Sequence, residues 1–202
     1  MAGFYFPKLK KMSNTKQGLG KTKRVAVYID GSNLYYKLKD LGIKNSTYFE
    51  YAAFAKWLAR GRSVVAKRYY VGVVRSKDGD EKSKKMQEGQ VRLFNHLQSN
   101  KEKFNIQRGY LMKNDGTFHE KGVDVKMAVD LLSGAYEDIY DVAILISSDT
   151  DLIPAIQKVK QLGKEVEYIG FSHKPSYGLI KNVNETRLLT KEDVEQFQVL
   201  RK

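Results

Sequence analysis

The chain has 202 residues, of which 42% are hydrophobic and 29% charged, as is ordinary for a globular domain. Its net charge of +13 favours a polyanionic partner, nucleic acid first and an acidic membrane surface second, over a merely basic solvated surface. The absence of cysteine excludes disulfides, thiolate catalysis and cysteine-based zinc sites, and the three histidines have no close spacing that would suit zinc.

The first 24 residues are basic and contain no acid. We expect them to form a flexible tail, which is either an electrostatic arm for nucleic acid or a solubilising leader. The basic residues in it are Lys8, Lys10, Lys11, Lys16, Lys21, Lys23 and Arg24. We expect one domain over residues 25–202. The sequence shows no secretory signal and no apolar run of transmembrane length, so we expect a cytoplasmic protein without a membrane partner.

From Val25 onward, strand patterns alternate with helix patterns. In chain order we predict a strand at 25–29, a tight turn at Gly31, helices from 34 and at 49–58, a strand at 64–74, a helix at 82–98 and a strand at 104–111. After a turn at 114–116 come a helix at 123–132, a strand at 140–146, a helix at 152–162, a strand at 166–171 and helices at 179–189 and 192–200. This alternation predicts an α/β fold of three layers, α/β/α, around a mostly parallel sheet.

Four aspartates occupy positions where such a fold would bring them together. Asp30 ends the first strand, Asp149 and Asp151 follow the strand at 140–146, and Asp124 opens a helix. Carboxyl ends of parallel strands meet at one edge of a sheet, where α/β proteins place their sites. Close carboxylates repel each other by about 4 kcal/mol per pair at an effective dielectric of about 20, so the cluster needs a cation. Mg²⁺ or Mn²⁺ is the leading choice, with phosphate chemistry as the consequence.

Each acid also has a simpler structural explanation. Asp30 is compatible with an ordinary strand-end turn, Asp124 with the dipole of its helix, and Asp151 with a helix cap. Asp130 lies four residues after Lys126, and we assign it the role of an ion-pair partner on the same helix. The set of four is therefore much more specific than any single member.

Three segments around these acids resemble the NYN domain family, the PIN-like ribonucleases related to the LabA proteins. They are Val-Tyr-Ile-Asp-Gly-Ser-Asn at 27–33, Lys-Gly-Val-Asp-Val-Lys-Met-Ala at 121–128 and Ile-Ser-Ser-Asp-Thr-Asp-Leu at 146–152. The resemblance runs from about Val25 to Leu189. It implies a PIN-like fold that hydrolyses RNA phosphodiester bonds, with one or two Mg²⁺ or Mn²⁺ ions held by Asp30, Asp124, Asp149 and Asp151.

The resemblance also implies roles around the acids. Asn33 would match a polar residue beside the first acid, and Ser148 a small polar residue near the metal. The chain has Asn184 where the family's last helix would carry an Asp, which removes support for a fifth acidic ligand. A homodimer is a further expectation, because PIN-like relatives often form one.

Basic and aromatic residues near the expected active edge are candidate contacts for RNA. We single out Arg75, Lys121 and Lys174 for phosphates, because each lies near a strand end or the loop before Asp124. Tyr35, Tyr36 and Tyr177 are candidates for stacking on bases. The alternative for each single residue is a solvated or packed side chain.

A metal-dependent ribonuclease is thus the leading hypothesis. The alternative is an RNA-binding regulatory protein of the same fold with weak or no cleavage, although a pure binder has no use for clustered carboxylates. A phosphatase of the haloacid dehalogenase type is a weaker reading of Asp149-Thr150-Asp151, because that family places its nucleophile in the first strand. A Rossmann dinucleotide enzyme is weaker still, because no glycine-rich loop follows Ile29.

Overall fold

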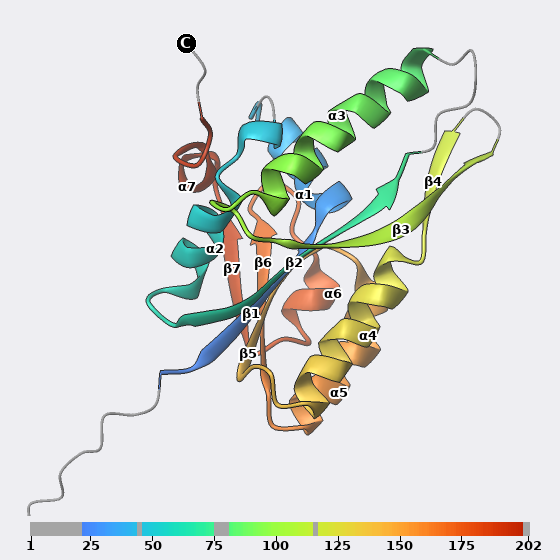
Figure 1. Ribbon diagram of the computed structural model, residues 1–202. Coiled ribbons are helices and arrows are strands. Elements are labelled where there is room, and N and C mark those ends of the chain that lie inside the picture. The colour runs from blue at the N-terminus through green and yellow to red at the C-terminus, as the bar shows by residue number, and fades with distance from the viewer. Residues whose placement is uncertain (1–21, 44–45, 75–80, 115–116, 200–202) are drawn as a thin grey trace, which may run out of the picture.

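The computed structural model describes residues 22–43, 46–74, 81–114 and 117–199, with backbone alone for 46, 110–114 and 117–121. Within these ranges the chain forms one seven-stranded sheet in the order β4-β3-β2-β1-β5-β6-β7 (Figure 1). The strands are β1 (Arg24–Asp30), β2 (Ser63–Val73), β3 (Asn105–Asn114), β4 (Thr117–Lys121), β5 (Val142–Ile146), β6 (Glu165–Phe171) and β7 (Glu185–Leu189). All neighbouring pairs are parallel except β3 and β4.

Helices cover both faces of this sheet (Figure 1). On one face lie α1 (Gly31–Asp40), α2 (Tyr51–Ala59), α3 (Glu81–Gln98) and α7 (Lys191–Glu195). On the other lie α4 (Val123–Tyr136), α5 (Ile153–Gln161) and α6 (Tyr177–Ile180). Two short 3₁₀ turns, η1 (Ser46–Tyr48) and η2 (Thr150–Leu152), complete the described elements. The predicted three-layer α/β/α class with a mostly parallel sheet is confirmed.

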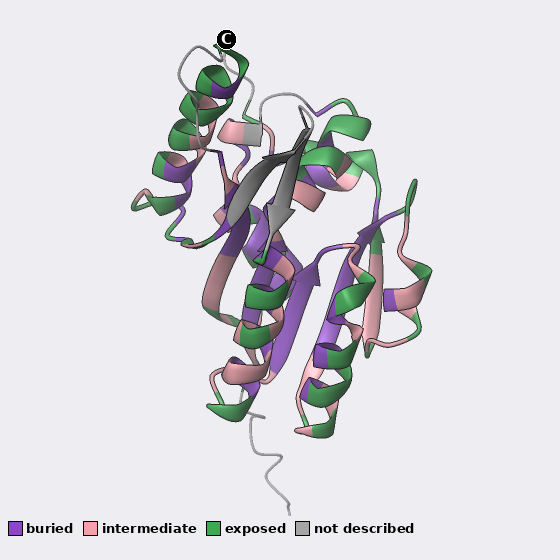
Figure 2. Ribbon diagram, turned by 90° about the vertical axis from the view of Figure 1, so that its right-hand side faces the viewer, coloured by how far each residue is buried: buried purple, intermediate pink, exposed green. Residues whose placement is uncertain are grey.

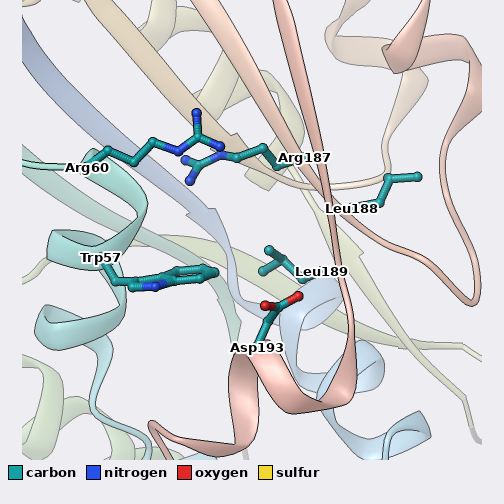
Figure 3. A pocket seen from close by; sticks show the side chains of 6 residues that line it. All are labelled: Trp57, Arg60, Arg187, Leu188, Leu189 and Asp193. Atoms are coloured by element: carbon teal, nitrogen blue, oxygen red, sulfur yellow. The ribbon is translucent and has the colours of Figure 1, made fainter.

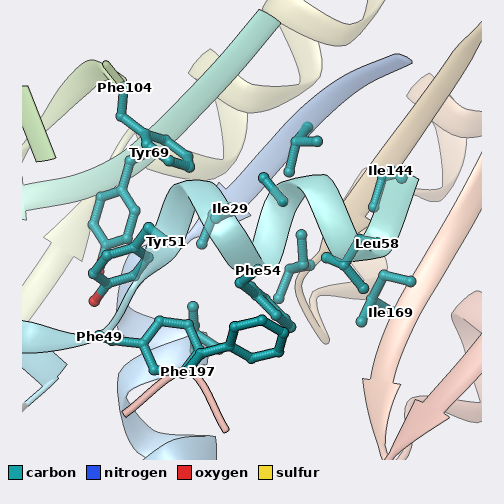
Figure 4. Packing of buried hydrophobic residues seen from close by; sticks show 14 of the residues in the cluster. Ile29, Phe49, Tyr51, Phe54, Leu58, Tyr69, Phe104, Ile144, Ile169 and Phe197 are labelled. Atoms are coloured by element: carbon teal, nitrogen blue, oxygen red, sulfur yellow. The ribbon is translucent and has the colours of Figure 1, made fainter. Parts of the chain in front are cut away.

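The core consists of two apolar layers, one on each side of the sheet. The first packs aromatic rings such as Phe49, Tyr51, Phe54 and Phe197 against β1, β5 and β6 (Figure 4). The second joins α4, α5 and α6 to the opposite face. Figure 2 shows the central strands buried while the helices turn exposed faces to solvent. Val142–Ile146 is buried at every residue, as its apolar pattern predicts.

Two predictions about the C-terminal part are wrong. The segment 179–189, predicted as one helix, forms the end of α6 and then the edge strand β7. The helix predicted at 192–200 is only the short α7, after which Gln198 forms a β-bridge with Phe49. The strand at 166–171 is therefore not the last one.

Two further differences concern turns. Of the turn predicted at 114–116, residues 115 and 116 lie outside the described residues, and Asn114 is the last residue of β3. Thr117 begins β4, a strand that the sequence pattern did not predict. Gly31 makes no separate turn, because α1 begins there directly after Asp30. Glycine is needed at this position for space: a Cβ atom on Gly31 would lie 2.3 Å from the ring of Tyr69. The close approach of α1 to β2 thus fixes where the chain leaves the first strand.

Candidate metal centre

The site begins at the carboxyl ends of the two central strands. Ile29 of β1 lies opposite Ile146 of β5, so Asp30 and Ser147 leave the sheet at the same level. After Asp30 the chain enters α1, and after Ser147 it enters the loop that leads to η2. Helix α4 begins next to the end of β4, which returns antiparallel along β3 to the same edge. Three separate segments of the chain therefore converge here.

Asp124, Asp149 and Asp151 form the centre of this convergence. One carboxylate oxygen from each lies within 4.8 Å of the others. Asp124 and Asp149 are half-buried and Asp151 is exposed, so the group opens to solvent. In the part of the chain that the structure describes, none of the three forms an ion pair with lysine or arginine. The ion pairs of the described residues thus leave the negative charge of the cluster unneutralised.

Asp30 stands beside this group and is held by hydrogen bonds. Its Oδ1 accepts from the backbone N–H of Asn33 at 2.9 Å and so caps α1. Its Oδ2 accepts from the hydroxyl of Ser147 at 3.0 Å, and the same hydroxyl oxygen accepts from the N–H of Asp149 at 3.1 Å. Ser147 therefore connects Asp30 to the loop of the other acids.

The capping role expected for Asp151 belongs to Asp149. Asp149 precedes η2, and its Oδ1 accepts a hydrogen bond of 2.9 Å from the N–H of Asp151. This bond fixes one oxygen of Asp149 and holds the two acids next to each other. Asp124 lies in the first turn of α4, as predicted.

Asp130 is structural, as predicted, but its partners lie on another element. It forms an ion pair of 2.9 Å with Arg68 of β2 and accepts a hydrogen bond of 2.7 Å from the hydroxyl of Tyr70. The predicted partner was Lys126 on the same helix. These contacts join α4 to the sheet and so hold the helix that presents Asp124.

The predicted substrate-binding residues lie in different places. Asn33 and Ser148 are adjacent, with 3.3 Å between the Ser148 hydroxyl and Asn33 Oδ1. Lys174 forms an ion pair of 2.7 Å with Asp40, at the end of α1 opposite Asp30 and about 15 Å along that helix. Arg75 and the side chain of Lys121 lie outside the described residues.

Asn184 lies far from the acids. Its side-chain oxygen accepts from the N–H of Val166 at 2.9 Å, at the beginning of β6 and therefore at the opposite edge of the sheet. An acid at this position would not reach the cluster.

Sequence reasoning missed two residues that position the acids. Ser147 is 1% exposed and makes the bridge described above. Gly178 of α6 touches η2, because a Cβ atom there would lie 2.8 Å from the Cγ2 of Thr150. The position of Ser147 directly after the most apolar strand is a sequence signal that could have identified it. The role of Gly178 is visible only in the folded chain.

The residues present suit a hard divalent cation. Such ions prefer oxygen ligands, and three carboxylates from two segments converge within the reach of one ion. Because no described basic side chain neutralises them, a cation at this place would relieve their mutual repulsion.

The model of the NYN domain family matches residues 24–189, which include all four aspartates. None of the curated proteins matches the chain. A solved structure of a protein of unknown function from Vibrio parahaemolyticus shares 20% identity, with a TM-score of 0.54 over 83% of this chain and 93% of that one, which shows a common fold.

A more distant structure is that of T5 5'-exonuclease with bound zinc ions. It has 18% identity and a TM-score of 0.43, over 72% of this chain and 55% of that one, and this similarity is too low to support a conclusion. Among the described residues, no helix is both long and apolar enough to cross a membrane. The family match covers most of the chain and contains the segments that hold the acidic cluster, and the protein therefore belongs to the NYN domain family.

Proposed function

We propose that the protein is a metal-dependent ribonuclease that hydrolyses RNA phosphodiester bonds with Mg²⁺ or Mn²⁺ at Asp30, Asp124, Asp149 and Asp151. The observation that supports this most directly is the convergence of three carboxylates without a neighbouring basic side chain among the described residues. Membership of the NYN domain family supports the same conclusion. We propose a cytoplasmic location, where RNA substrates are present.

Each acid has a distinct part in this proposal. Asp124, Asp149 and Asp151 hold the cation, and the hydrogen bond from the Asp151 N–H orients Asp149. Asp30, fixed by Ser147 and by the N–H of Asn33, adds a fourth carboxylate beside them. A bound divalent cation would lower the pKa of a water molecule that it binds and would neutralise charge on the phosphate.

Charge and exposed aromatic rings support a nucleic acid as the substrate. The net charge of +13 attracts a polyanion. On α1, shortly after Asn33, Tyr35 and Tyr36 are 45% and 61% exposed, and Tyr177 beside η2 is 71% exposed. Such rings stack on unpaired bases of any sequence. The choice of RNA over DNA comes from the family resemblance.

The test is cleavage of labelled RNA and DNA oligonucleotides with Mn²⁺, Mg²⁺ or EDTA, for the wild type and Asp149→Asn. We expect the wild type to cleave RNA only when the metal is present. In the variant the cleavage rate should fall by more than the roughly 10- to 100-fold that is typical of residues that only support metal ligands. RNA binding should persist in the variant. Glu137→Gln is the matched control, because Glu137 is exposed at the end of α4, outside the cluster.

Two results would contradict the proposal. Full activity in Asp149→Asn would exclude a metal site at these acids. A wild type that binds RNA with strong salt dependence but cleaves nothing would favour the regulatory RNA-binding protein instead.

A further inference from the structure

A pocket of about 360 Å³ lies away from the acids, between α2, β7 and α7 (Figure 3). Its volume is within the range of small-ligand sites in proteins. The residues that line it are Trp57, Arg60, Arg187, Leu188, Leu189 and Asp193. None of these residues has a role in the acidic cluster.

Trp57 gives the pocket a rigid aromatic wall. Its ring stacks on Phe54 at 6.2 Å between centroids and packs against Phe197 at 5.7 Å. These contacts fix the indole, yet 37% of Trp57 is exposed. A large aromatic residue held in this way offers a preformed surface on which a flat ring can stack.

Two arginines meet at one end of the pocket. Arg60 follows Trp57 by three residues, at the end of α2, and its guanidinium points toward that of Arg187 (Figure 3). Arg187 is only 11% exposed in its side chain, and its buried Nε has no hydrogen-bond partner among the described residues. Burial and the nearby charge of Arg60 lower the pKa of Arg187. Nη2 of Arg187 already donates to the carbonyl oxygen of Leu58 at 2.6 Å. An anion between the two guanidinium groups would reduce the repulsion between them.

The carboxylates near Arg60 and Arg187 neutralise these two arginines only in part. Arg60 pairs with Glu185 at 2.7 Å, but both side chains are about half exposed. Glu167 makes its shorter contacts with Arg62, and lies 3.6 Å from Arg187. At the other end of the pocket, Asp193 is held by Thr190 through its Oδ2. That carboxylate can accept a hydrogen bond from an N–H group of a bound ligand.

We propose that this pocket is a nucleotide subsite, in which a base stacks on Trp57 and its phosphate binds Arg60 and Arg187. The combination of an aromatic wall with paired guanidinium groups matches a base linked to a phosphate. A carboxylate opposite the arginines favours a base with N–H donors on its edge, such as guanine. That the nucleotide belongs to an RNA strand rests on the proposed function.

The subsite would hold RNA at a distance from the acids. β7 is two strands away from β5, or about 10 Å across the sheet. The pocket is on the α2 side of the sheet, whereas Asp124 comes from α4 on the other side. One RNA strand that occupies both places must therefore cross from the α2 side of the sheet to the edge at which the acids lie.

Trp57 is the only tryptophan in the chain, so its fluorescence reports on the pocket directly. We would titrate the full chain in EDTA with guanosine monophosphate, and with guanosine as the probe without phosphate. We expect saturable quenching by the nucleotide and much weaker binding of the nucleoside. Arg60→Ala should weaken nucleotide binding about tenfold, the effect of removing one charged hydrogen bond.

Two control variants separate the subsite from general electrostatics. Lys56→Ala removes an exposed charge from the same helix outside the pocket, and should leave binding unchanged. Glu185→Gln breaks the Arg60 ion pair but keeps Arg60, so binding should be kept or strengthened. Absence of quenching, or equal weakening by Arg60→Ala and either control, would overturn the subsite.

The experiment is independent of cleavage. Quenching that follows this pattern in a protein without nuclease activity would keep the subsite and refute the ribonuclease. Metal-dependent cleavage without quenching would keep the ribonuclease and refute the subsite.

Discussion

The hydroxyl group of Ser147 joins two segments that are far apart in the sequence. It donates to Asp30 at the end of β1 and accepts from the N–H of Asp149 after β5. Since Ser147 is 1% exposed, water cannot easily replace either bond. The relative position of Asp30 and Asp149 thus depends on one buried oxygen atom.

Replacing this hydroxyl should disturb both stability and catalysis. Ser147→Ala leaves a backbone donor unpaired and removes a donor from Asp30, so we expect a loss of about 1–3 kcal/mol in the free energy of unfolding. We also expect cleavage to fall by roughly 10- to 100-fold, as for other residues that orient metal ligands. Urea unfolding and RNA cleavage rates measure the two effects.

Ser148→Ala is the matched control for this prediction. Ser148 is more exposed and its contact with Asn33 is longer, at 3.3 Å. Its removal should cost less stability. Equal losses for the two serines would show that the bridge has no special importance.

At this scale the sequence predicts the acids but not the groups that hold them. Asp124 and Asp149 are identified by their places after strands and at a helix start, and the structure brings them together with Asp151. The partner of Asp130 was predicted from spacing along one helix, yet the ion pair reaches Arg68 on β2. Local spacing cannot reveal a contact that depends on how a helix packs on a sheet.

At the scale of elements, helix α6 supports the loop that carries two acids. Gly178 packs so closely on Thr150 that a Cβ atom would lie 2.8 Å from Cγ2. Thr150 stands between Asp149 and Asp151, so any displacement of Thr150 moves at least one carboxylate. The helix therefore takes part in positioning the candidate metal ligands without contributing one.

Gly178→Ala should reduce cleavage because it forces Thr150 away from α6. Overpacking of this kind costs about 1–3 kcal/mol in stability. The double variant Gly178→Ala/Thr150→Ala removes the clashing methyl group and should recover cleavage and stability together. Gly89→Ala in α3 is the control, because the nearest atom to its Cβ is 3.9 Å away. A double variant no better than the single one would contradict this explanation.

The amino ends of β1 and β5 are joined by a salt bridge that should make stability depend on pH. The guanidinium and backbone N–H of Arg24 hold the pKa of Asp141 well below its usual range. Above the unfolded-state value of about 3.9 the carboxylate is ionised in both states, and the full contribution is present. As the pH falls below that value, the unfolded state takes up the proton first and the contribution is lost.

Asp141→Asn should therefore lower stability at neutral pH and flatten the loss of stability in acid. Urea unfolding between about pH 2 and pH 6 tests this. Asp138→Asn is the comparison, because Asp138 binds the same arginine but its side chain is 68% exposed, so a smaller effect is expected. An acid profile unchanged in Asp141→Asn would refute the assignment.

The local sequence pattern predicts most of the helices and strands, and the elements that it does not predict share a cause. Glu185–Leu189 contains no β-branched residue except Thr186, and its sequence alone suits a helix. It becomes a strand because β6 offers a free edge beside it. β4 likewise depends on its antiparallel pairing with β3. Whether a segment forms an edge strand depends on the strand beside it, and the local sequence pattern contains no information about that strand.

At the scale of the whole molecule, the excess of positive charge should govern RNA binding. Residues 1–21 contain five lysines and no acid. If they bind RNA, their deletion should weaken binding and reduce the slope of log K against log salt by about 0.7 for each phosphate that these lysines neutralise. Anisotropy of a labelled single-stranded RNA at several salt concentrations measures this slope.

The deletion should stop before Arg24, because this residue belongs to β1 and pairs with Asp141. The same deletion should leave urea unfolding unchanged, which serves as the control. A salt slope equal to that of the full chain would mean that the segment is only a leader.

The pairing of β1 with β5 also determines when the site exists during synthesis. The hydrogen bond from Ser147 to Asp30 spans 117 residues of chain. A ribosome must therefore complete β5 and the loop up to Asp151 before the acids can meet, however early β1 has been made. A nascent chain that stops before β5 has Asp30 and Asp124 but no cluster. The candidate metal centre therefore cannot form until most of the core has been translated.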